Sequence, residues 1–324
     1  MRILVIGAGG MLGAKLIARL VQDGAIGGRE IAHLTRADMM PCAPMTADFY
    51  VETVACDLSA PGVAVQMMAG KPDLIFHLAA VVSGEAERDF DKGYRINLDG
   101  TRYLLEAARE AGHCPKIIFT SSIAVFGAPF PGVIADDFFT TPLTSYGTQK
   151  AMGELLLSDY SRRGFVDGVA LRMPTVCVRP GLPNAAASGF FSNIIREPLV
   201  GLPAVLPVED SVRHWFASPR AAVGFLIKAA EMDLAALGAR RTLTLPGLSC
   251  TVAGQIEALR RAAGDRAVAL ISKRADPAIA RIVEGWPQRF DAARAIALGF
   301  EAETSFDSII RAHIEDELGG GSPR

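Results

Sequence analysis

The sequence predicts an α/β fold, with a doubly wound parallel sheet and a smaller, discontinuous C-terminal domain. Strand and helix patterns alternate through the first half of the chain, as they do where helices cover both faces of a sheet. The strand patterns are continuous apolar runs, which is typical of parallel strands buried on both faces. A glycine-rich turn joins the first strand to the first helix, and the 324 residues exceed the usual span of one hydrophobic core.

The elements follow in order along the chain. Strand patterns cover residues 3–6, 31–35, 51–56, 73–78, 116–120, 168–172 and 241–245. Helix patterns cover residues 11–22, 97–111, 146–160, 251–261 (with Thr251 as cap) and 291–298 (ended by Gly299). A polar loop is expected at 24–30, prolines punctuate residues 174–207 as in substrate loops, and the tail 318–324 is expected to fray. We therefore assign 1–173, with a return segment near 208–235, to a nucleotide-binding domain, and 174–207 and 236–324 to a substrate domain.

Composition excludes several classes of function. A formal net charge of −2 without a basic stripe predicts no affinity for nucleic acid or anionic lipid. Lys15 and Arg19 interrupt the apolar N-terminus, and no segment reaches the roughly 20 apolar residues that span a bilayer, so we expect a cytoplasmic protein. The five cysteines are scattered without CxxC spacing, which predicts reduced thiols and no metal site.

The glycine-rich turn predicts a dinucleotide site of the Rossmann type. Gly7 permits the tight turn, Gly9 or Gly10 lets the backbone approach a pyrophosphate, and Gly13 lets the helix pack on the strand. The amides at the start of that helix face the anion.

The residues after the next strands bear on the choice of cofactor. Asp38 can accept hydrogen bonds from the adenosine ribose and repel a 2′-phosphate, which favours NAD, whereas Arg36 keeps NADP open. Asp57 and Leu58 can flank the adenine, although Asp57 can equally cap the next turn.

Tyr146 and Lys150 form the sharpest catalytic signal. Residues four apart share a helix face, so the Lys150 ammonium can lower the pKa of the Tyr146 phenol and make it a base. Ser121 and Ser122 end the strand 116–120, at the sheet edge where ligands bind in open α/β folds. A serine hydroxyl there can hold the substrate oxygen while Tyr146 takes the proton.

These motifs together resemble the extended short-chain dehydrogenase/reductases, the NAD-dependent epimerase/dehydratase family. The match comprises GxxGxxG from Gly7, HLAA at 77–80, INLDGT at 96–101, SSxxVxG at 121–127, YxxxK at 146–150 and LGF at 298–300. The resemblance implies that Ser122 is the catalytic serine, with Ser121 as the alternative, and that Asn97 is the fourth active-site residue, supporting a water that leads the proton out. From sequence alone Asn97 can equally be a helix N-cap, and His77 is more simply a core residue.

The resemblance also implies further cofactor contacts and a homodimer through the helices that carry Asn97 and Tyr146. Phe126 stands where the family usually has tyrosine, which touches no assigned role. The additional cofactor-binding residues are Met11, Leu12, Leu78, Ala79, Ala80 and Pro174.

Two segments of the second half, 172–199 and 211–222, resemble a group within the family that oxidises the C2 hydroxyl of four-carbon sugar acids to 2-oxo acids. Arg179 or Arg213 can clamp the substrate carboxylate, although each can also be an ordinary ion pair. Trp215 can wall the pocket or simply pack. The other candidates for binding substrate hydroxyls are Ser83, Ser122, Thr175, Asn184 and Ser188.

Three other functions compete with this one. An epimerase or dehydratase would retain its NAD through turnover, and a dehydratase is disfavoured because Ile123 and Ala124, not an acid, follow Ser122. A cofactor-sensing binding protein would be expected to lack Tyr146 or Lys150. A steroid-type oxidoreductase needs a more apolar pocket than these arginine-bearing loops predict.

Overall fold

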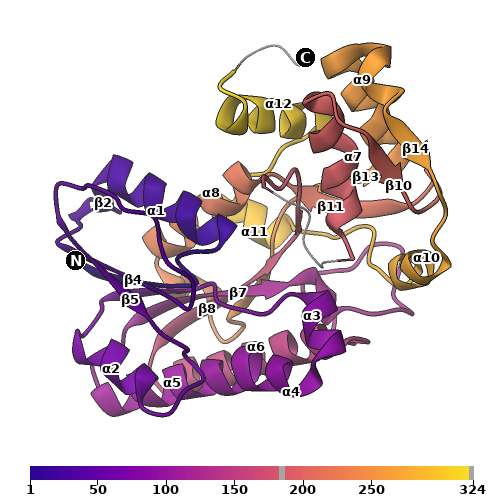
Figure 1. Cartoon of the computed structure of the whole chain (residues 1–324). Coiled ribbons are helices and arrows are strands. Elements are labelled where there is room, and N and C mark those ends of the chain that lie inside the picture. Colours follow the sequence, from indigo (N-terminus) through magenta and orange to yellow (C-terminus); the bar gives the residue numbers. More distant parts are fainter. Residues whose placement is uncertain (182–186, 321–324) are drawn as a thin grey trace. The chain divides into compact units, whose positions relative to one another are not determined.

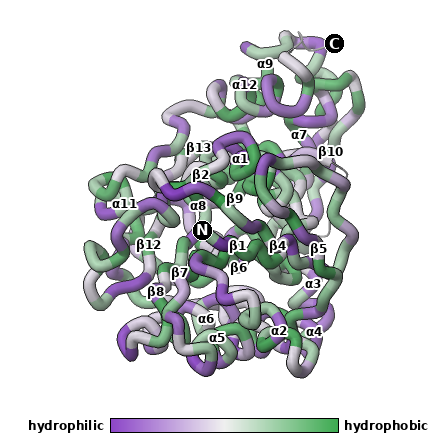
Figure 2. Tube along the Cα trace, turned by 90° about the vertical axis from the view of Figure 1, so that its left-hand side faces the viewer, coloured by the Kyte–Doolittle hydropathy of each residue, from purple (hydrophilic) through white to green (hydrophobic). Residues whose placement is uncertain are grey.

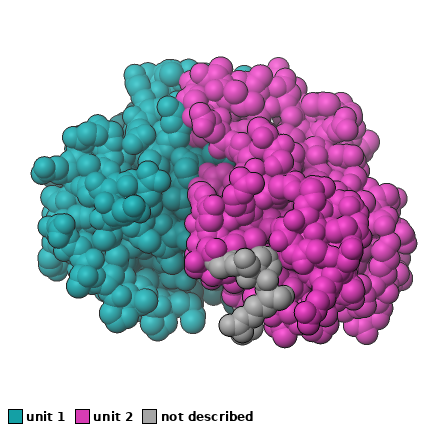
Figure 3. All heavy atoms as spheres, turned by 90° about the horizontal axis from the view of Figure 1, so that it is seen from above, with its two compact units in different colours: residues 1–125, 144–172, 223–243 teal, residues 126–143, 173–222, 244–324 magenta. Residues whose placement is uncertain are grey.

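A computed structural model describes residues 1–181 and 187–320 (Figure 1). The chain divides into two compact units, coloured separately in Figure 3. Unit 1 contains residues 1–125, 144–172 and 223–243, and unit 2 contains residues 126–143, 173–222 and 244–324.

Unit 1 holds a seven-stranded sheet in the order β12-β8-β7-β6-β1-β4-β5. Its strands are β1 (Arg2–Ile6), β4 (His33–Asp38), β5 (Tyr50–Ala55), β6 (Leu74–His77), β7 (Lys116–Ser122), β8 (Asp167–Met173) and β12 (Thr242–Thr244). The central pairs β4–β5, β1–β4, β1–β6 and β6–β7 are parallel. The middle strands carry the hydrophobic colours of Figure 2, because nearly all of their side chains are buried.

Helices cover both faces of this sheet (Figure 1). On one face lie α2 (Val63–Ala69), α5 (Gly100–Ala111) and α6 (Ser145–Arg162); on the other lie α1 (Met11–Asp23) and the unit 1 part of α8 (Pro219–Glu231). The shorter elements of the unit are β2 (Ala25–Ile26), β3 (Arg29–Glu30), α3 (Ser83–Arg88), α4 (Phe90–Gly93), η1 (Tyr94–Asp99), η2 (Ile123–Val125) and η3 (Leu234–Leu237). The predicted doubly wound α/β fold is confirmed.

Unit 2 is built from two small sheets and five helices in its described part. The sheets have the orders β13-β11-β9 and β10-β14. The elements are β9 (Thr175–Val176), α7 (Gly189–Leu199), β10 (Ala204–Leu206), β11 (Arg213–Ala217), β13 (Leu248–Thr251), α9 (Val252–Val268), β14 (Ile271–Lys273), α10 (Pro277–Glu284), α11 (Ala293–Ala297) and α12 (Phe306–Glu317).

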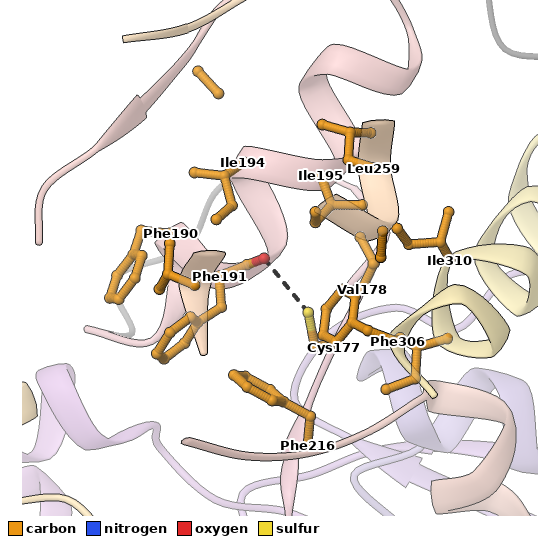
Figure 4. Close-up of a cluster of buried hydrophobic side chains, with 14 of the residues drawn as sticks. Cys177, Val178, Phe190, Phe191, Ile194, Ile195, Phe216, Leu259, Phe306 and Ile310 are labelled. Carbon is orange, nitrogen blue, oxygen red and sulfur yellow. Dashed lines mark hydrogen bonds between the residues drawn. The ribbon is translucent and has the colours of Figure 1, made fainter. Parts of the chain in front are cut away.

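The core of unit 2 forms around α7 (Figure 4). Phe190, Phe191, Ile194 and Ile195 recur at the spacing that places them along one helix face. They belong to one buried cluster with Phe216, Leu259, Phe306 and Ile310, contributed by β11, α9 and α12. Each such side chain contributes about 1.5–3 kcal/mol on burial, so this cluster gives unit 2 a core of its own.

Three sequence-based expectations about elements differ from the structure. The polar loop expected at 24–30 contains a short hairpin, in which Ala25 pairs with Glu30. The helix was expected to begin at residue 97, but the backbone is already helical at Tyr94, where the π-helix η1 begins. The helix capped by Thr251 extends past residue 261 to Val268, although Gly264, with φ of +77°, breaks its regular backbone.

The structural units change at residues other than the predicted domain boundaries. The chain returns to the sheet-bearing unit over residues 223–243, which extend into β12 at the sheet edge, whereas the predicted return segment was 208–235. Residues 126–143 belong to unit 2, although the prediction placed them in the nucleotide-binding domain. The assignment of nucleotide and substrate binding to the two domains stays a prediction.

Candidate active site

The register of the sheet gathers the predicted residues at one edge. Ile6 of β1 pairs with Ala37 of β4 and with His77 of β6, and His77 pairs with Phe119 of β7. The residues that follow these positions therefore leave the sheet at its carboxyl edge. Ligands of open α/β sheets bind outside this edge.

Gly7 and Gly13 occupy positions where a side chain has no room. Gly7 has φ of +92°, and a Cβ on it would lie 2.6 Å from the Ala79 amide nitrogen. A Cβ on Gly13 would lie 2.1 Å from the Gly7 carbonyl oxygen, so α1 packs directly on the turn. Gly10 caps α1 without a side chain, and Gly9 and Gly10 are exposed. This cradle fits a dinucleotide pyrophosphate, with Met11 and Leu12 in the first turn of the helix.

Asp38 and Arg36 end in different surroundings. The Asp38 carboxylate accepts hydrogen bonds from the amide nitrogens of Gly9 (2.8 Å) and Met40 (2.8 Å), so it lies against the glycine turn. The Arg36 guanidinium donates to the Ala43 carbonyl (2.8 Å) and the Thr53 hydroxyl (2.6 Å). The acid, not the arginine, is therefore held at the turn.

The remaining cofactor candidates of unit 1 lie beside the same turn or in its support. The amides of Leu78 and Ala79 both donate to the Ile6 carbonyl, at 2.8 and 3.0 Å, and Ala80 follows them. Asp57 caps the next turn by accepting from the Ser59 amide (2.9 Å), and it pairs with Arg95 (2.8 Å). Burial opposes ionisation of Asp57, but these partners outweigh it and lower its pKa. Leu58 is buried in the core, which leaves its predicted adenine contact untested.

Lys150 is buried beside Tyr146. Its Nζ donates to the Thr120 carbonyl at 2.7 Å and lies 4.7 Å from the centre of the Phe119 ring and 5.7 Å from that of the Tyr146 ring. Burial lowers the pKa of Lys150 to about 7, and the charge of Glu154 opposes that shift. The ammonium is thus poorly solvated, so its electric field on a neighbouring phenol is weakly screened.

The first turn of α6 packs tightly against the end of β7. Thr144 caps α6 by accepting from the Gly147 amide at 3.0 Å. A Cβ on Gly147 would lie 2.1 Å from the carbonyl oxygen of Ala124, in η2. This close approach brings the half-buried Tyr146 to the segment that directly follows Ser122.

The two serines of β7 have different partners. Ser121 is buried and its hydroxyl donates to the Glu154 carboxylate at 2.5 Å. The Ser122 oxygen accepts from the Ala124 amide at 3.1 Å and is only partly buried. These contacts favour Ser122, the first choice of the sequence analysis, as the serine that meets a substrate.

Asn97 lies inside the π-helix η1, so it is not the helix N-cap that the sequence left open. Its side-chain oxygen accepts from the Val81 amide (2.9 Å), and its nitrogen donates to the Gln149 side chain (2.8 Å). Asn97 therefore connects the segment after β6 to α6 next to Lys150. π-Bulges of this kind occur frequently at functional sites.

His77 is a core residue, as expected. Its Nε2 lies 2.9 Å from the Thr101 hydroxyl, and burial lowers its pKa to about 3. A neutral imidazole with no exposed face is not a suitable base.

The predicted substrate residues divide between the units. Ser83 begins α3 in unit 1. In unit 2, the Thr175 hydroxyl lies 2.7 Å from Nε2 of the buried His214, and the Trp215 indole donates to the Leu245 carbonyl at 3.2 Å. Pro174, a cofactor candidate, is buried in the same unit. Trp215 is therefore held by packing within unit 2.

The two candidate arginines differ in what they contact. Arg179 donates to the Val176 carbonyl (3.0 Å) and the Ser188 hydroxyl (2.8 Å), within its own loop region. Arg213 lines a cavity of about 570 Å³ in unit 2 and reaches the Ser249 carbonyl only at 3.3 Å. The cavity is lined by Val208, Glu209, Ser211, Val212, Arg213, Pro277, Ala280, Arg281, Val283, Glu284 and Gln288. Asn184 lies outside the described residues.

Several polar residues of this region were not predicted as site residues. They are Thr120, Gln149, Glu154 and Arg172. Glu154 stands four residues beyond Lys150, so its place on the catalytic helix face could have been read from spacing. Arg172 could not, because its contact with α6 depends on tertiary packing.

The described part of the chain contains neither a candidate metal cluster nor a candidate membrane-spanning helix. Within 1–181 and 187–320, no group of three or more His, Cys, Asp or Glu side chains is arranged to hold a metal ion. In the same residues, no helix combines the length and the apolar character needed to cross a bilayer.

Residues 3–218 match the model of the NAD dependent epimerase/dehydratase family. The chain belongs to this family. The match covers the glycine turn, Asn97, the β7 serines and the Tyr146–Lys150 pair, which confirms the resemblance stated from the motifs. Family membership and the glycine cradle together support NAD as the cofactor.

Relatives of nearly the same length are known. The chain is 50% identical over 321 residues to D-erythronate dehydrogenase of Cupriavidus necator, with 98% of each chain covered. It is 40% identical over 319 residues to D-erythronate dehydrogenase of Haemophilus influenzae, covering 98% of this chain and all of that one. A crystal structure described as a nucleoside-diphosphate-sugar epimerase from Agrobacterium tumefaciens matches with a TM-score of 0.97 and 62% identity, covering 99% of this chain and 95% of that one. The two named dehydrogenases support the prediction of an oxidoreductase.

Proposed function

We propose that this protein oxidises the C2 hydroxyl of a four-carbon sugar acid, such as D-erythronate, to the 2-oxo acid with NAD. The observation that carries the proposal is the buried Lys150 ammonium beside the Tyr146 ring, at the sheet edge that also bears the glycine cradle. The similarity over the whole chain to two proteins named D-erythronate dehydrogenase supplies the substrate class.

The proposed mechanism assigns one task to each residue. Tyr146, as phenolate, takes the proton of the C2 hydroxyl, and the Ser122 hydroxyl holds the same oxygen. Lys150 lowers the pKa of Tyr146 and holds the nicotinamide ribose. NAD held at the glycine cradle would supply the acceptor for the C2 hydride, so the products would be the 2-oxo acid, NADH and a proton that passes first to Tyr146. Asn97 supports the water path by which that proton leaves, and its contacts with Val81 and Gln149 keep this part of the site in place.

Arg213 is the proposed partner of the substrate carboxylate. Its guanidinium reaches the Ser249 carbonyl and hydroxyl at 3.3 and 3.4 Å, whereas the Arg179 guanidinium donates at 3.0 and 2.8 Å to Val176 and Ser188. A guanidinium can bind a carboxylate through two parallel hydrogen bonds. The other proposed substrate contacts are Ser83, Thr175 and Trp215.

Asp38 supports NAD over NADP. Its carboxylate is held at the glycine turn, where a 2′-phosphate would meet a negative charge. The proposal also includes a homodimer through η1–α5 and α6, since Leu155 on α6 is 69% exposed and a second copy would bury it. The proposed location of this dimer is the cytoplasm.

The decisive test is turnover of purified protein with D-erythronate and its four-carbon stereoisomers, followed by the absorbance of the reduced cofactor. We expect net reduction of NAD, with NADP used far less well. The variant Y146F should lose about 10²–10⁴-fold in kcat because it lacks the base, while the Kd for NAD stays within a few-fold of wild type. Turnover by Y146F near the wild-type rate would refute the assignment.

An NAD-retaining sugar-nucleotide epimerase is the second candidate, because the 62% identical crystal structure carries that description. Such an enzyme returns the hydride to its substrate and accumulates no NADH. Sugar nucleotides that are interconverted without net NADH, together with inert sugar acids, would select this function instead.

A further inference from the structure

A buried ion pair lies behind Lys150. The Glu154 carboxylate on α6 accepts from Nη2 of Arg172 at 2.8 Å and from its Nε at 3.0 Å, so the guanidinium of β8 binds both carboxylate oxygens. The two side chains are only 3% and 6% exposed. A bidentate pair at such depth is geometrically specific, and removing one partner would leave an uncompensated charge.

The same carboxylate reaches the strand that carries the catalytic serine. The Ser121 hydroxyl donates to Oε1 of Glu154 at 2.5 Å. Glu154 thus joins α6, β7 and β8 at one point. Tyr146, Lys150 and Glu154 follow one another at intervals of four residues, so they lie along one face of α6.

We propose that Glu154 is a positioning residue, whose charge keeps the Lys150 ammonium protonated and whose carboxylate fixes the end of β7 next to Ser122. This inference rests on the proposed roles of Tyr146 and Lys150. It adds a residue that touches neither substrate nor cofactor and that acts through Lys150 and Ser122.

The surroundings of Lys150 contain few charges. From β7 it meets the Thr120 carbonyl and the Phe119 ring, which are uncharged. From β6 it faces His77, which burial keeps neutral because the pKa of that imidazole is lowered to about 3.

The other elements near Lys150 add one carboxylate, which is itself paired with the Arg172 guanidinium of β8. η1 presents Asn97, which bonds to the neighbouring Gln149. On α6 itself the titratable neighbours are Tyr146 and Glu154, and Glu154 is the group whose charge raises the pKa of Lys150 against the effect of burial.

Loss of the Glu154 charge has a defined consequence for the phenol. A buried lysine without an opposing carboxylate releases its proton at lower pH, and a neutral amine no longer favours phenolate. The pKa of Tyr146 then rises, so the reaction needs more alkaline conditions. An opposite charge on a neighbouring side chain shifts a pKa by about one unit or more.

The test variant is E154Q, which retains an oxygen to accept from Ser121 but carries no charge. The apo protein is titrated by ¹⁵N NMR of the Lys150 Nζ, assigned by its absence in K150M. We expect the pKa of Lys150 to fall by about one unit, and the rising limb of kcat/KM against pH to move up by about the same amount. The Kd for NAD at neutral pH is measured alongside.

Two further variants separate electrostatics from stability. E154Q leaves Arg172 buried without its partner, so E154Q/R172M removes both charges and replaces the guanidinium by an apolar side chain of similar length. The double variant should recover the denaturation midpoint lost in E154Q and keep both pH displacements with the same sign but a smaller size, because the Arg172 charge is removed as well. E106Q is the matched control, because Glu106 on α5 likewise accepts from a residue of α6, Tyr160, and from an arginine, Arg109, whereas the carboxylate that acts on Lys150 is Glu154.

The outcomes are distinguishable. An unchanged Lys150 pKa in the folded double variant, or a rate lowered equally at every pH, overturns the role of Glu154 while Tyr146 and Lys150 keep theirs. Full activity of Y146F instead removes the proposed function on which the inference rests, whatever E154Q does.

Discussion

Ser121 and Ser122 are neighbours in β7, and the alternation of a strand sends their side chains to opposite faces. Ser121 faces Glu154 and Arg172, and Ser122 lies on the other face, where we propose that the substrate oxygen is held. The family motif favoured Ser122 and left Ser121 as the alternative, since both stand at the end of an apolar run. Their partners in the structure distinguish them.

We predict that S122A and S121A differ in what they lose. S122A should lower kcat by about 10²-fold or more, because a donor aimed at the reacting oxygen is removed, with little change in stability. S121A should instead cost about 1–3 kcal/mol of unfolding free energy, because a buried carboxylate loses one of its donors. The measurements are steady-state kinetics and urea denaturation of both variants. The reverse pattern, with S121A inactive and S122A active, would transfer the catalytic role to Ser121.

Much of the candidate site could be predicted at the scale of single residues because its members are close in sequence. Tyr146 and Lys150 lie one helical turn apart, and the glycines of the turn lie within seven residues. The supporting contacts could not be predicted in the same way. Glu154 meets Arg172 only because β8 packs near α6, and Asn97 meets Gln149 across 52 residues of chain.

At the scale of elements, glycines decide how closely helices approach the sheet. A Cβ at Gly13 would lie 2.1 Å from a backbone oxygen, whereas Gly224 in α8 is exposed with nothing within 4 Å of its Cβ position. The same chemical change, Gly to Ala, therefore has opposite consequences in two helices of unit 1.

We predict that G13A destabilises the protein by about 1–3 kcal/mol, because α1 must move away from the turn. The displaced amides should also weaken NAD binding by about tenfold or more, a loss of about 1.4 kcal/mol. The matched control G224A should stabilise the protein by about 0.4–1 kcal/mol through the entropy of the unfolded chain and leave the Kd for NAD unchanged. Denaturation midpoints and fluorescence titration with NAD measure both. Wild-type affinity in G13A would show that α1 does not need its close approach.

The elements themselves could be predicted to different degrees. Long apolar runs such as β1 and β6 give a clear period, and their expected bounds lie within one residue of those observed at each end. The hairpin of β2 and β3 has only two residues in each strand, too few for an alternating pattern to show. The π-helix η1 has no sequence signature of its own, because its hydrogen bonds and not its residue types distinguish it.

At the scale of the whole molecule, the alternation of strands and helices predicted the sheet. The division into units was harder to predict, because each unit is assembled from three segments that are far apart in the sequence. Residues 126–143 follow β7 and the short η2 of unit 1, and yet they belong to unit 2, where Ile134 forms a bridge to Phe290. No local pattern announces a contact between residues so far apart. The two units have one feature in common, a buried histidine within an apolar strand.

These histidines, His77 in unit 1 and His214 in unit 2, predict how stability responds to acid. Burial is the main cause that lowers the pKa of each to about 3, against about 6.5 in an unfolded chain. The unfolded chain therefore binds protons below pH ~6.5 that the folded chain does not, so stability falls as the pH falls through this value. Between pH 7 and pH 5 each histidine should account for about 2 kcal/mol of lost unfolding free energy.

The measurement is urea denaturation at several pH values from 7 to 5, a window chosen because carboxylates titrate mainly below it. H77Q and H214Q should each lower the slope by the share of one histidine, and the double variant should lower it by the sum of the two, even where the variants start from a lower stability. The two histidines lie in different units, so the two effects should add. Curves for wild type and the double variant that stay parallel between pH 7 and pH 5 would mean that the imidazoles accept protons in the folded protein, and the apolar surroundings described for them would then be wrong.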